Sequence, residues 1–320
     1  MTCYNPSLAW KSKNVLRSTG KYDIVFPSDK LIIDTKKYDP IHIPCGKCVG
    51  CLMDRARTWA VRCVLEASLW TKNCYITLTY NDENLPENGT LVKEHFVLFM
   101  KRLRKKYGDG IRFFQCGEYG TLNHRPHYHA CLFNFDFPDK VVWKKGESGS
   151  ILYRSPSLEK LWPYGFSSIG EVTVKSAAYV ARYCLKKYDH DTYRRQPPPP
   201  GCIDEYTNMS RKPGIASGWF EKYVDDVYNS DCLVVSEKLK CKPPRYFDSL
   251  MDRIAPEYMV GVRDRRSEAA LASLLKLYPA DEEELRYWMT CNEHRSRLKV
   301  EEDVMRIRVE KLKRGYESEN

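Results

Sequence analysis

Two histidines on one predicted strand have the spacing of metal ligands. His127 and His129 flank Tyr128 in the segment RPHYHACLF, whose composition is typical of a β-strand. Alternate residues of a strand face the same side, so the two imidazoles project together and Tyr128 projects from the opposite face. Two neighbouring imidazoles on a rigid strand form half of a divalent metal site. The same spacing also arises by chance on strands that bind nothing.

A carboxylate on the preceding strand could complete this site. Glu118 lies in the segment CGEYG and could supply a third, oxygen ligand. Two histidines and one carboxylate leave coordination positions open for a substrate phosphate, as a catalytic metal requires. Mixed nitrogen and oxygen ligands allow Mg²⁺ or Mn²⁺.

A pair of tyrosines is the second feature that could carry chemistry. Tyr179 and Tyr183 in AAYVARYCLKK are one helical turn apart, with Lys186 on the same stripe and Lys187 beside it. A phenol is a weak nucleophile at neutral pH because its ordinary pKa is about 10. A nearby ammonium favours the phenolate, and a metal polarises the phosphate that it would attack. Aromatic pairs at this spacing also serve simply as core packing.

The pattern of the chain predicts a sheet and helices that position these residues. Strands are predicted over residues 74–80, 111–116, 128–135 and 166–174, and a short one around 30–34. Helices are predicted over residues 52–71, 92–107 and 175–188, with Gly108 ending the second of them.

A proline run then separates this part from the remainder. The segment QPPPPG at 196–201 can continue neither a helix nor a central strand, and charged helical stretches follow at 268–278 and 281–313. We expect an α+β fold with a central antiparallel sheet flanked by helices and a helical C-terminal extension. The expected regions are an N-terminal part at 1–72, a core at 73–190 and a Pro-rich linker with a largely helical region at 191–320.

Composition narrows the class of protein. The chain has 320 residues with 52 basic and 42 acidic side chains, a formal charge of +10, and 42% of its residues are hydrophobic. The hydrophobic fraction excludes wholesale disorder. No apolar run approaches the roughly 18 residues that span a bilayer, and no secretory pattern opens the chain. We therefore expect a soluble, intracellular protein whose acidic partner is nucleic acid.

Thirteen cysteines support a reducing compartment. Most stand singly in apolar stretches, as small buried thiols do, for example Cys63, Cys74, Cys131 and Cys184.

One group of cysteines is clustered. Cys45, Cys48 and Cys51 in the run CGKCVGC have the spacing of a zinc knuckle, where glycine permits a tight turn. A structural Zn²⁺ needs a fourth ligand, and the sequence offers Cys3, His42 or Cys63 without choosing among them. Three reduced cysteines at a helix start, with no metal, are the alternative.

Two basic stretches are candidates for phosphate contacts. Three arginines share one predicted helix and five basic residues end the next, namely Arg55, Arg57 and Arg62, then Lys101, Arg102, Arg104, Lys105 and Lys106. Such charges make DNA affinity fall with salt. Solvated helix faces carry the same pattern.

Taken in order, these motifs resemble those of the HUH endonucleases that initiate rolling-circle replication. The segments YITLTY, GEYG with RPHYHACLF, and YVARYCLKK are similar to the three motifs of the two-tyrosine HUH superfamily. The opening MTCYNPSLAW, the PCGKCVGC run before RARTWAVR, and RKPGIASGWF resemble replication initiators of microviruses, in the gokushovirus branch. The resemblance covers roughly residues 1–225.

The resemblance implies a metal-dependent nickase and ligase with an HUH endonuclease fold. His127, His129 and Glu118 would bind Mg²⁺ or Mn²⁺, and Tyr179 or Tyr183 would attack the scissile phosphate of viral origin DNA, helped by Lys186. A 5′-phosphotyrosine link and a 3′-OH primer would result, and the displaced strand would be closed into a circle. Since the chain has no GxxxxGK[ST] loop, a host helicase and a host DNA polymerase are expected partners in the bacterial cytoplasm, with no membrane involved.

Other classes remain open on the sequence alone. A two-tyrosine relaxase or transposase would use the same chemistry. A non-catalytic nucleic-acid-binding protein would use a zinc knuckle and basic helices, and its histidines and tyrosines would be ordinary core residues. A metal-dependent phosphodiesterase would release its product without a covalent intermediate.

Overall fold

The computed structural model describes most of the chain. The described residues are 3–15, 22–27, 33–120, 123–146, 149–182, 197–236, 239–277 and 292–310. They form two compact units, which are described separately. The sheet unit is drawn from Arg55–Asp189 and Arg195–Pro256, and the cysteine unit from Met1–Asp54 and Glu257–Leu312.

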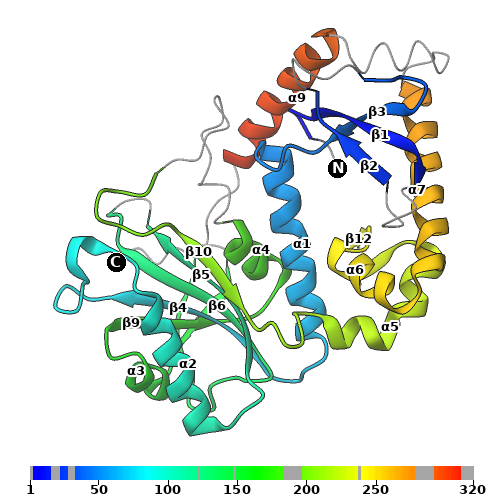
Figure 1. Cartoon of the computed structure of the whole chain (residues 1–320). Helices are drawn as coiled ribbons and strands as arrows, with labels where there is room; N and C mark the ends of the chain where they lie inside the picture. The colour runs from blue at the N-terminus through cyan, green and yellow to red at the C-terminus, as the bar shows by residue number, and fades with distance from the viewer. Residues whose placement is uncertain are drawn as a thin grey trace. The chain divides into compact units, whose positions relative to one another are not determined.

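The sheet unit is built on one antiparallel sheet with the strand order β10-β5-β6-β4-β9-β8-β7 (Figure 1). Its strands are β4 (Asn73–Tyr80), β5 (Arg112–Tyr119), β6 (Pro126–Phe133), β7 (Val141–Lys145), β8 (Ile151–Arg154), β9 (Gly165–Gly170) and β10 (Tyr206–Met209). The helices of this unit are α2 (Lys93–Tyr107), α3 (Pro156–Leu161), α4 (Val174–Arg182), α5 (Ser217–Ser230) and α6 (Arg245–Ile254). A hairpin of β11 (Leu233–Ser236) and β12 (Leu239–Cys241) completes it.

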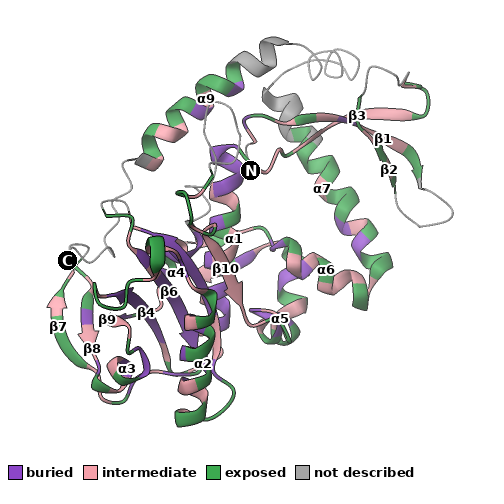
Figure 2. Cartoon of the chain, turned by 60° about the vertical axis from the view of Figure 1, so that its left-hand side comes forward, coloured by how far each residue is buried: buried purple, intermediate pink, exposed green. Residues whose placement is uncertain are grey.

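Helices cover both faces of this sheet. One hydrophobic cluster joins Ile76, Leu78 and Tyr128 to the buried side of α2 and to α3. A second cluster joins Tyr75 and Phe133 to α4 and to α1 (Val49–Ala67), which begins in the cysteine unit. The central strands are buried, whereas β7 at the sheet edge is exposed (Figure 2). This arrangement confirms the predicted α+β class with a central antiparallel sheet flanked by helices.

Local sequence explains several boundaries. Gly108 ends α2 with a φ of 92°, a conformation that favours glycine, as predicted. The strand predicted over 166–174 is shorter than expected, because Thr173 caps α4 by accepting a hydrogen bond from the Ser176 amide at 3.1 Å. The hairpin β7–β8, the short helix α3 and strand β10 were not predicted.

The cysteine unit contains a three-stranded antiparallel sheet of order β2-β1-β3 and two helices. Its strands are β1 (Ser7–Val15), β2 (Tyr22–Val25) and β3 (Tyr38–Ile43), and its helices are α7 (Pro256–Leu277) and α9 (Asn292–Glu310). The C-terminal helices therefore correspond to the predicted helical extension. None of the described helices is both long and apolar enough to cross a membrane.

Candidate active site

Three neighbouring strands place the predicted metal ligands on one face of the sheet. Across β4 and β6, Thr79 lies opposite His127 and Thr77 lies opposite His129. Across β5 and β6, Glu118 lies opposite His127. Because residues paired across a sheet share a face, these side chains project together, toward the side where α1 and α4 pack. Tyr128 projects to the opposite face and is buried there, as predicted.

Glu118, His129 and Tyr179 meet on this face. One oxygen of Glu118, Oε1, lies 3.2 Å from Nε2 of His129 and accepts a hydrogen bond from the Tyr179 hydroxyl at 3.1 Å. The Tyr179 ring stands edge-on to the His129 ring, with centroids 5.0 Å apart. All three residues are at most 6% exposed. A single carboxylate oxygen thus contacts both a predicted metal ligand and a predicted nucleophile.

His127 lies next to this group and is less buried. Its ring centroid is 6.1 Å from that of His129. A Cβ atom on Gly120 would lie 2.9 Å from the His127 Nε2, too close for any real side chain. The second glycine of the GEYG segment therefore leaves this ring nitrogen its space.

Hydroxyl groups of β4 hold both imidazoles from the other side. The His129 Nδ1 lies 2.7 Å from the Tyr75 hydroxyl and 3.0 Å from that of Thr77, and the His127 Nδ1 lies 3.0 Å from that of Thr79. Burial raises the pKa of the Tyr75 hydroxyl well above its ordinary value, so this group stays neutral.

These contacts bear on whether a cation fits. A hydroxyl that accepts a hydrogen bond from Nδ1–H leaves the Nε2 lone pair available, and a metal-binding histidine uses this arrangement. The 3.2 Å between His129 Nε2 and Glu118 Oε1 also suits two ligands of one ion. The residues present therefore fit a divalent cation held by the two histidines and Glu118.

Part of the predicted tyrosine motif is not described. Tyr183 and Lys186, together with Lys187, lie outside the described residues, since α4 is described to Arg182. Tyr179 is the member of this motif that the structure places, and it faces the histidines.

The sequence reasoning missed the hydroxyl groups that contact the imidazoles. A signal was present, because Tyr75, Thr77 and Thr79 alternate in CYITLTY and must share one face of a strand. What the sequence does not show is the register that sets Thr77 and Thr79 opposite His129 and His127.

The predicted basic stretches divide into exposed and structural residues. Arg62 is only 8% exposed; it stacks between the rings of Trp59 and Tyr246 and donates to the Ile215 carbonyl. It is therefore part of the packing and does not contact DNA, contrary to its predicted role. Arg102 and Arg104 likewise donate to backbone carbonyls.

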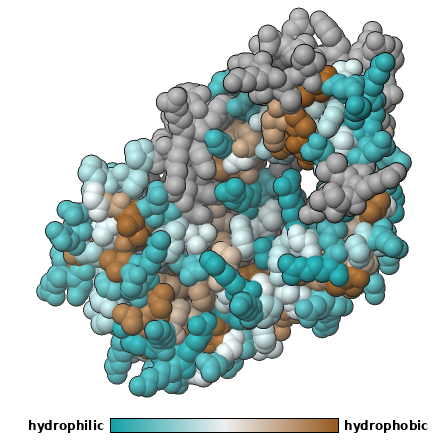
Figure 3. All heavy atoms as spheres, viewed as in Figure 1, coloured by the Kyte–Doolittle hydropathy of each residue, from teal (hydrophilic) through white to brown (hydrophobic). Residues whose placement is uncertain are grey.

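The exposed members of these stretches remain candidates for phosphate contacts. They are Arg55, Arg57, Lys101, Lys105 and Lys106. Hydrophilic side chains cover most of the face seen in Figure 3, and hydrophobic ones form small separate patches on it.

The predicted cysteine cluster has a fourth member in the structure. The sulfur atoms of Cys3, Cys45, Cys48 and Cys51 all lie within 4.8 Å of one another, so the group could hold a metal. Hydrogen bonding between the thiols raises the pKa of Cys3 to about 12, raises that of Cys51 and lowers that of Cys48. Among the isolated thiols predicted to be buried, Cys63, Cys74 and Cys131 are buried and free, and Cys184 lies outside the described residues.

Comparison with known proteins points to one family. Residues 73–188 match the family model of the replication-associated protein ORF2. The chain is 34% identical over 248 residues to the replication-associated protein ORF2 of Spiroplasma virus 4, covering 73% of this chain and 76% of that protein. It is 33% identical over 243 residues to the replication-associated protein VP4 of Bdellovibrio phage phiMH2K, covering 73% and 74%.

A third relative is less similar. The chain is 29% identical over 230 residues to the replication-associated protein ORF4 of Chlamydia phage 1, covering 67% of this chain and 55% of that protein. No solved structure matches the chain.

Proposed function

The chain belongs to the phage replication-associated proteins, and on this basis we propose that it initiates viral DNA replication as a site-specific nickase and strand-transfer ligase. Its substrate is the origin of the double-stranded replicative form, cut as single-stranded or extruded DNA. The cut leaves a 3′-OH that primes rolling-circle synthesis. The displaced strand is later closed into a circle.

One observation carries this proposal, namely the contact of Glu118 with both His129 and Tyr179. A phenol that served only as packing would have no need of a buried carboxylate as its hydrogen-bond acceptor. Here the Tyr179 hydroxyl donates to Glu118 Oε1, and the same oxygen lies 3.2 Å from an imidazole nitrogen. The geometry suits a phosphate bound beside a tyrosine nucleophile.

In the proposed reaction the Tyr179 oxygen attacks the scissile phosphorus and its proton passes to Glu118 Oε1. The new bond joins phosphorus to the tyrosine oxygen, and the bond from phosphorus to the 3′ oxygen breaks. The 3′ oxygen leaves as a hydroxyl after taking a proton, and the 5′ side stays linked to the protein. Because one phosphate ester replaces another, the reaction needs no ATP and can run in reverse to join a strand.

A divalent cation, Mg²⁺ or Mn²⁺, would supply positive charge that stabilises the phosphate in the transition state. His127, His129 and Glu118 are the residues proposed to hold it. The hydroxyl groups of Tyr75, Thr77 and Thr79 keep the imidazoles in the required orientation.

The proposal assigns the second tyrosine and the lysine by sequence spacing. Tyr183 follows Tyr179 by one helical turn and would attack the regenerated origin after one round of synthesis. Lys186 would neutralise the phosphate beside them. Strand separation and synthesis would come from a host helicase and a host DNA polymerase, with the reaction in the bacterial cytoplasm.

The test is a cleavage assay on denaturing gels. The probes are overlapping single-stranded oligonucleotides that cover the phage genome encoding this chain, incubated with and without Mn²⁺. The variants are Tyr179→Phe, Tyr183→Phe, the double variant and His127→Ala, and Tyr223→Phe on α5 is the matched control. We expect a metal-dependent covalent adduct that disappears in the double variant and in His127→Ala and persists in Tyr223→Phe.

The other outcomes identify the competing functions. Cleavage that survives in the double variant, or that proceeds without an adduct, would make the protein a metal-dependent phosphodiesterase. Oligonucleotides that are bound but never cut would make it a nucleic-acid-binding protein without this activity.

A further inference from the structure

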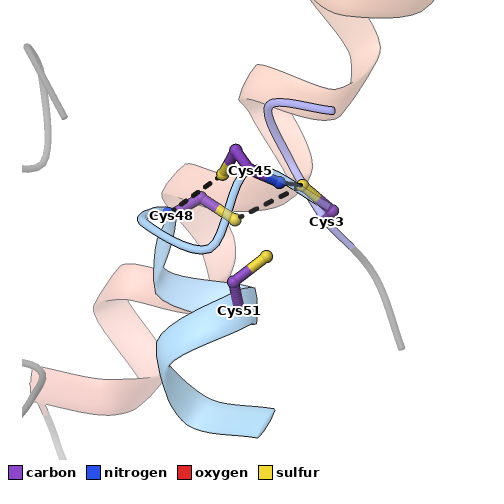
Figure 4. A group of neighbouring side chains, drawn as sticks. All are labelled: Cys3, Cys45, Cys48 and Cys51. Atoms are coloured by element: carbon purple, nitrogen blue, oxygen red, sulfur yellow. Dashed lines mark hydrogen bonds between the residues drawn. The ribbon is translucent and has the colours of Figure 1, made fainter. Parts of the chain in front are cut away.

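We propose that Cys3, Cys45, Cys48 and Cys51 bind one Zn²⁺ and that this ion is required for the folding of the cysteine unit. The site is separate from the proposed DNA cleavage reaction. It takes its ligands from two parts of the chain, the N-terminal segment and the loop and first turn that begin α1 (Figure 4).

The arrangement of the sulfur atoms fits a single tetrahedral ion. All four lie within 4.8 Å of one another, and Cys48 Sγ is 3.9 Å from Cys3 Sγ. Zinc–sulfur bonds of about 2.3 Å in a tetrahedron place the sulfurs about 3.8 Å apart. This spacing leaves no room for an iron–sulfur cluster, whose cysteines bind different irons.

Backbone amides already point at the sulfur atoms. Tyr4 N donates to Cys48 Sγ at 3.4 Å, and Cys45 N donates to Cys3 Sγ at 3.2 Å. Cys45 Sγ accepts from the amides of Lys47 and Cys48 at 3.4 and 3.3 Å. Amide donors of this kind stabilise thiolates and orient them as ligands.

A tight turn makes these contacts possible. Gly46, between the first two ligands of the C-x-x-C segment, has a φ of 74°, in the left-handed region that favours glycine.

The structure also selects the fourth ligand. Cys63 is 12 residues beyond Cys51 on α1, a separation of about 18 Å at 1.5 Å per residue, and it is buried in the core of the sheet unit. His42 lies on β3 and is not in the group. Cys3 joins the other three although 41 residues lie between it and Cys45 in the sequence.

The surroundings of the cluster indicate a structural role. Tyr4, Val49 and two of the cysteines are buried, and Met305 and Val309 of α9 pack against them. The amide of Val49 at the start of α1 donates to Glu302 of α9 at 3.4 Å. The cluster therefore lies where the N-terminal segment, α1 and α9 meet.

The remainder of the cysteine unit buries little. Residues of β3 are all half-buried, and those of β2 alternate between exposed and half-buried. A unit with so small a hydrophobic core usually depends on metal or disulfide bonds, and zinc binding then supplies folding free energy. The cysteines of the cluster are free thiols, which leaves the metal.

The first experiment measures the metal content of the full chain by inductively coupled plasma mass spectrometry. We expect about one zinc per chain, as one four-ligand site requires. Cys3→Ser should reduce zinc at least tenfold, and Cys232→Ser, a half-buried cysteine outside the cluster, should not. Cys3→His restores a ligand and should retain zinc.

Cobalt substitution and hydrogen exchange make the test independent of expression yield. Co²⁺ should give the visible absorption of a four-thiolate tetrahedral site in the wild type and a shifted spectrum in Cys3→His. Chelation should abolish amide protection in β1 and α9 and leave it unchanged in β4 and β6.

Three results would overturn the proposal. They are a purified chain that holds iron or no metal and gives no cobalt spectrum, a Cys3→His chain with an unshifted spectrum, or a chelated chain that keeps full protection in β1 and α9.

Discussion

At the scale of single residues, the candidate site is a set of short contacts around two imidazoles. Each imidazole has its Nδ1 within 3.0 Å of a hydroxyl group from β4. His129 has a second such contact, with Tyr75, and its Nε2 faces Glu118. The ring therefore has a carboxylate on one side and hydroxyls on the other, which fixes its orientation before any ligand binds.

The first prediction concerns Tyr75→Phe. Removal of the hydroxyl takes away the shorter of the two hydrogen bonds to His129 Nδ1, so Mn²⁺ affinity should fall by about 10–100-fold, the range for partners of metal ligands. Calorimetric Mn²⁺ titration measures this effect. Tyr80→Phe is the matched control, because Tyr80 is equally buried on the same strand and contacts His95 and Tyr128 instead. Equal affinity in both variants would remove Tyr75 from the site.

At the scale of elements, a buried carboxylate joins α1, β5 and the start of α5. Glu66 of α1 is 1% exposed; its Oε1 lies 2.6 Å from Arg112 Nε of β5, and its Oε2 accepts from the Ala216 amide at 2.6 Å. Arg112 also donates to the carbonyls of Pro213 and Gly214. This network positions the sheet face that carries the histidines under α1.

The second prediction is that Glu66→Ala lowers the free energy of unfolding by about 3–5 kcal/mol, because it leaves the largely buried charge of Arg112 without its partner. Glu159→Ala, which breaks the more exposed pair with Arg154, should cost no more than about 1 kcal/mol. Urea unfolding followed by tryptophan fluorescence compares them. Similar losses of stability in the two variants would contradict the structural role given to Glu66.

The third prediction concerns acid stability and His95 of α2. Burial lowers the pKa of His95 below its ordinary value of 6.5, and its Nδ1 lies 2.8 Å from the Tyr80 hydroxyl. As the pH falls below 6.5, the unfolded chain binds a proton at His95 more readily than the folded chain does, so stability falls. Above this pH both states are neutral there and the effect vanishes.

Thermal unfolding between pH 5 and pH 8 tests this third prediction. His95→Gln should show a smaller loss of Tm on acidification than the wild type, and His124→Gln, in the exposed β5–β6 turn, should behave like the wild type. A wild-type slope retained in His95→Gln would assign the acid sensitivity to other groups.

At the scale of the whole molecule, the two units differ in how they are stabilised. The sheet unit has buried layers on both faces of its sheet, with large side chains such as Trp162 and Phe96 fully buried. The cysteine unit has few buried residues beyond those near Cys48 and Cys51. The charge of +10 is a property of the complete chain and favours association with DNA.

The fourth prediction is that this charge acts partly through the exposed lysines of α2. Lys101, Lys105 and Lys106 changed together to Gln should reduce the salt dependence of single-stranded DNA binding by about two units of log K against log salt, about 0.7 for each phosphate that is no longer neutralised. Fluorescence anisotropy at several salt concentrations measures the slope. A control triple removes three scattered exposed lysines, Lys160, Lys222 and Lys242. If both triples change the slope equally, α2 is not a preferred contact.

The sequence by itself determined the local features of this protein. Alternation predicted that His127 and His129 share a face and that Tyr128 faces away, and the structure agrees, because the period of two is a property of any strand. Apolar spacing and Gly108 likewise predicted α2 almost to the residue. The spacing of Cys45, Cys48 and Cys51 marked a cluster for the same reason, since these residues are close in the chain.

Only the tertiary structure decided which distant residues meet. Glu118 and Tyr179 are 61 residues apart, and their contact depends on how α4 packs against β5. Cys3 was one of three possible partners for the cysteine cluster, and the path of the N-terminal segment selected it. Arg62 matches its exposed neighbours Arg55 and Arg57 in type, but the side of α1 that it occupies faces Trp59 and Tyr246. Periodicity describes one element at a time, whereas register and packing arise from the joint burial of several elements.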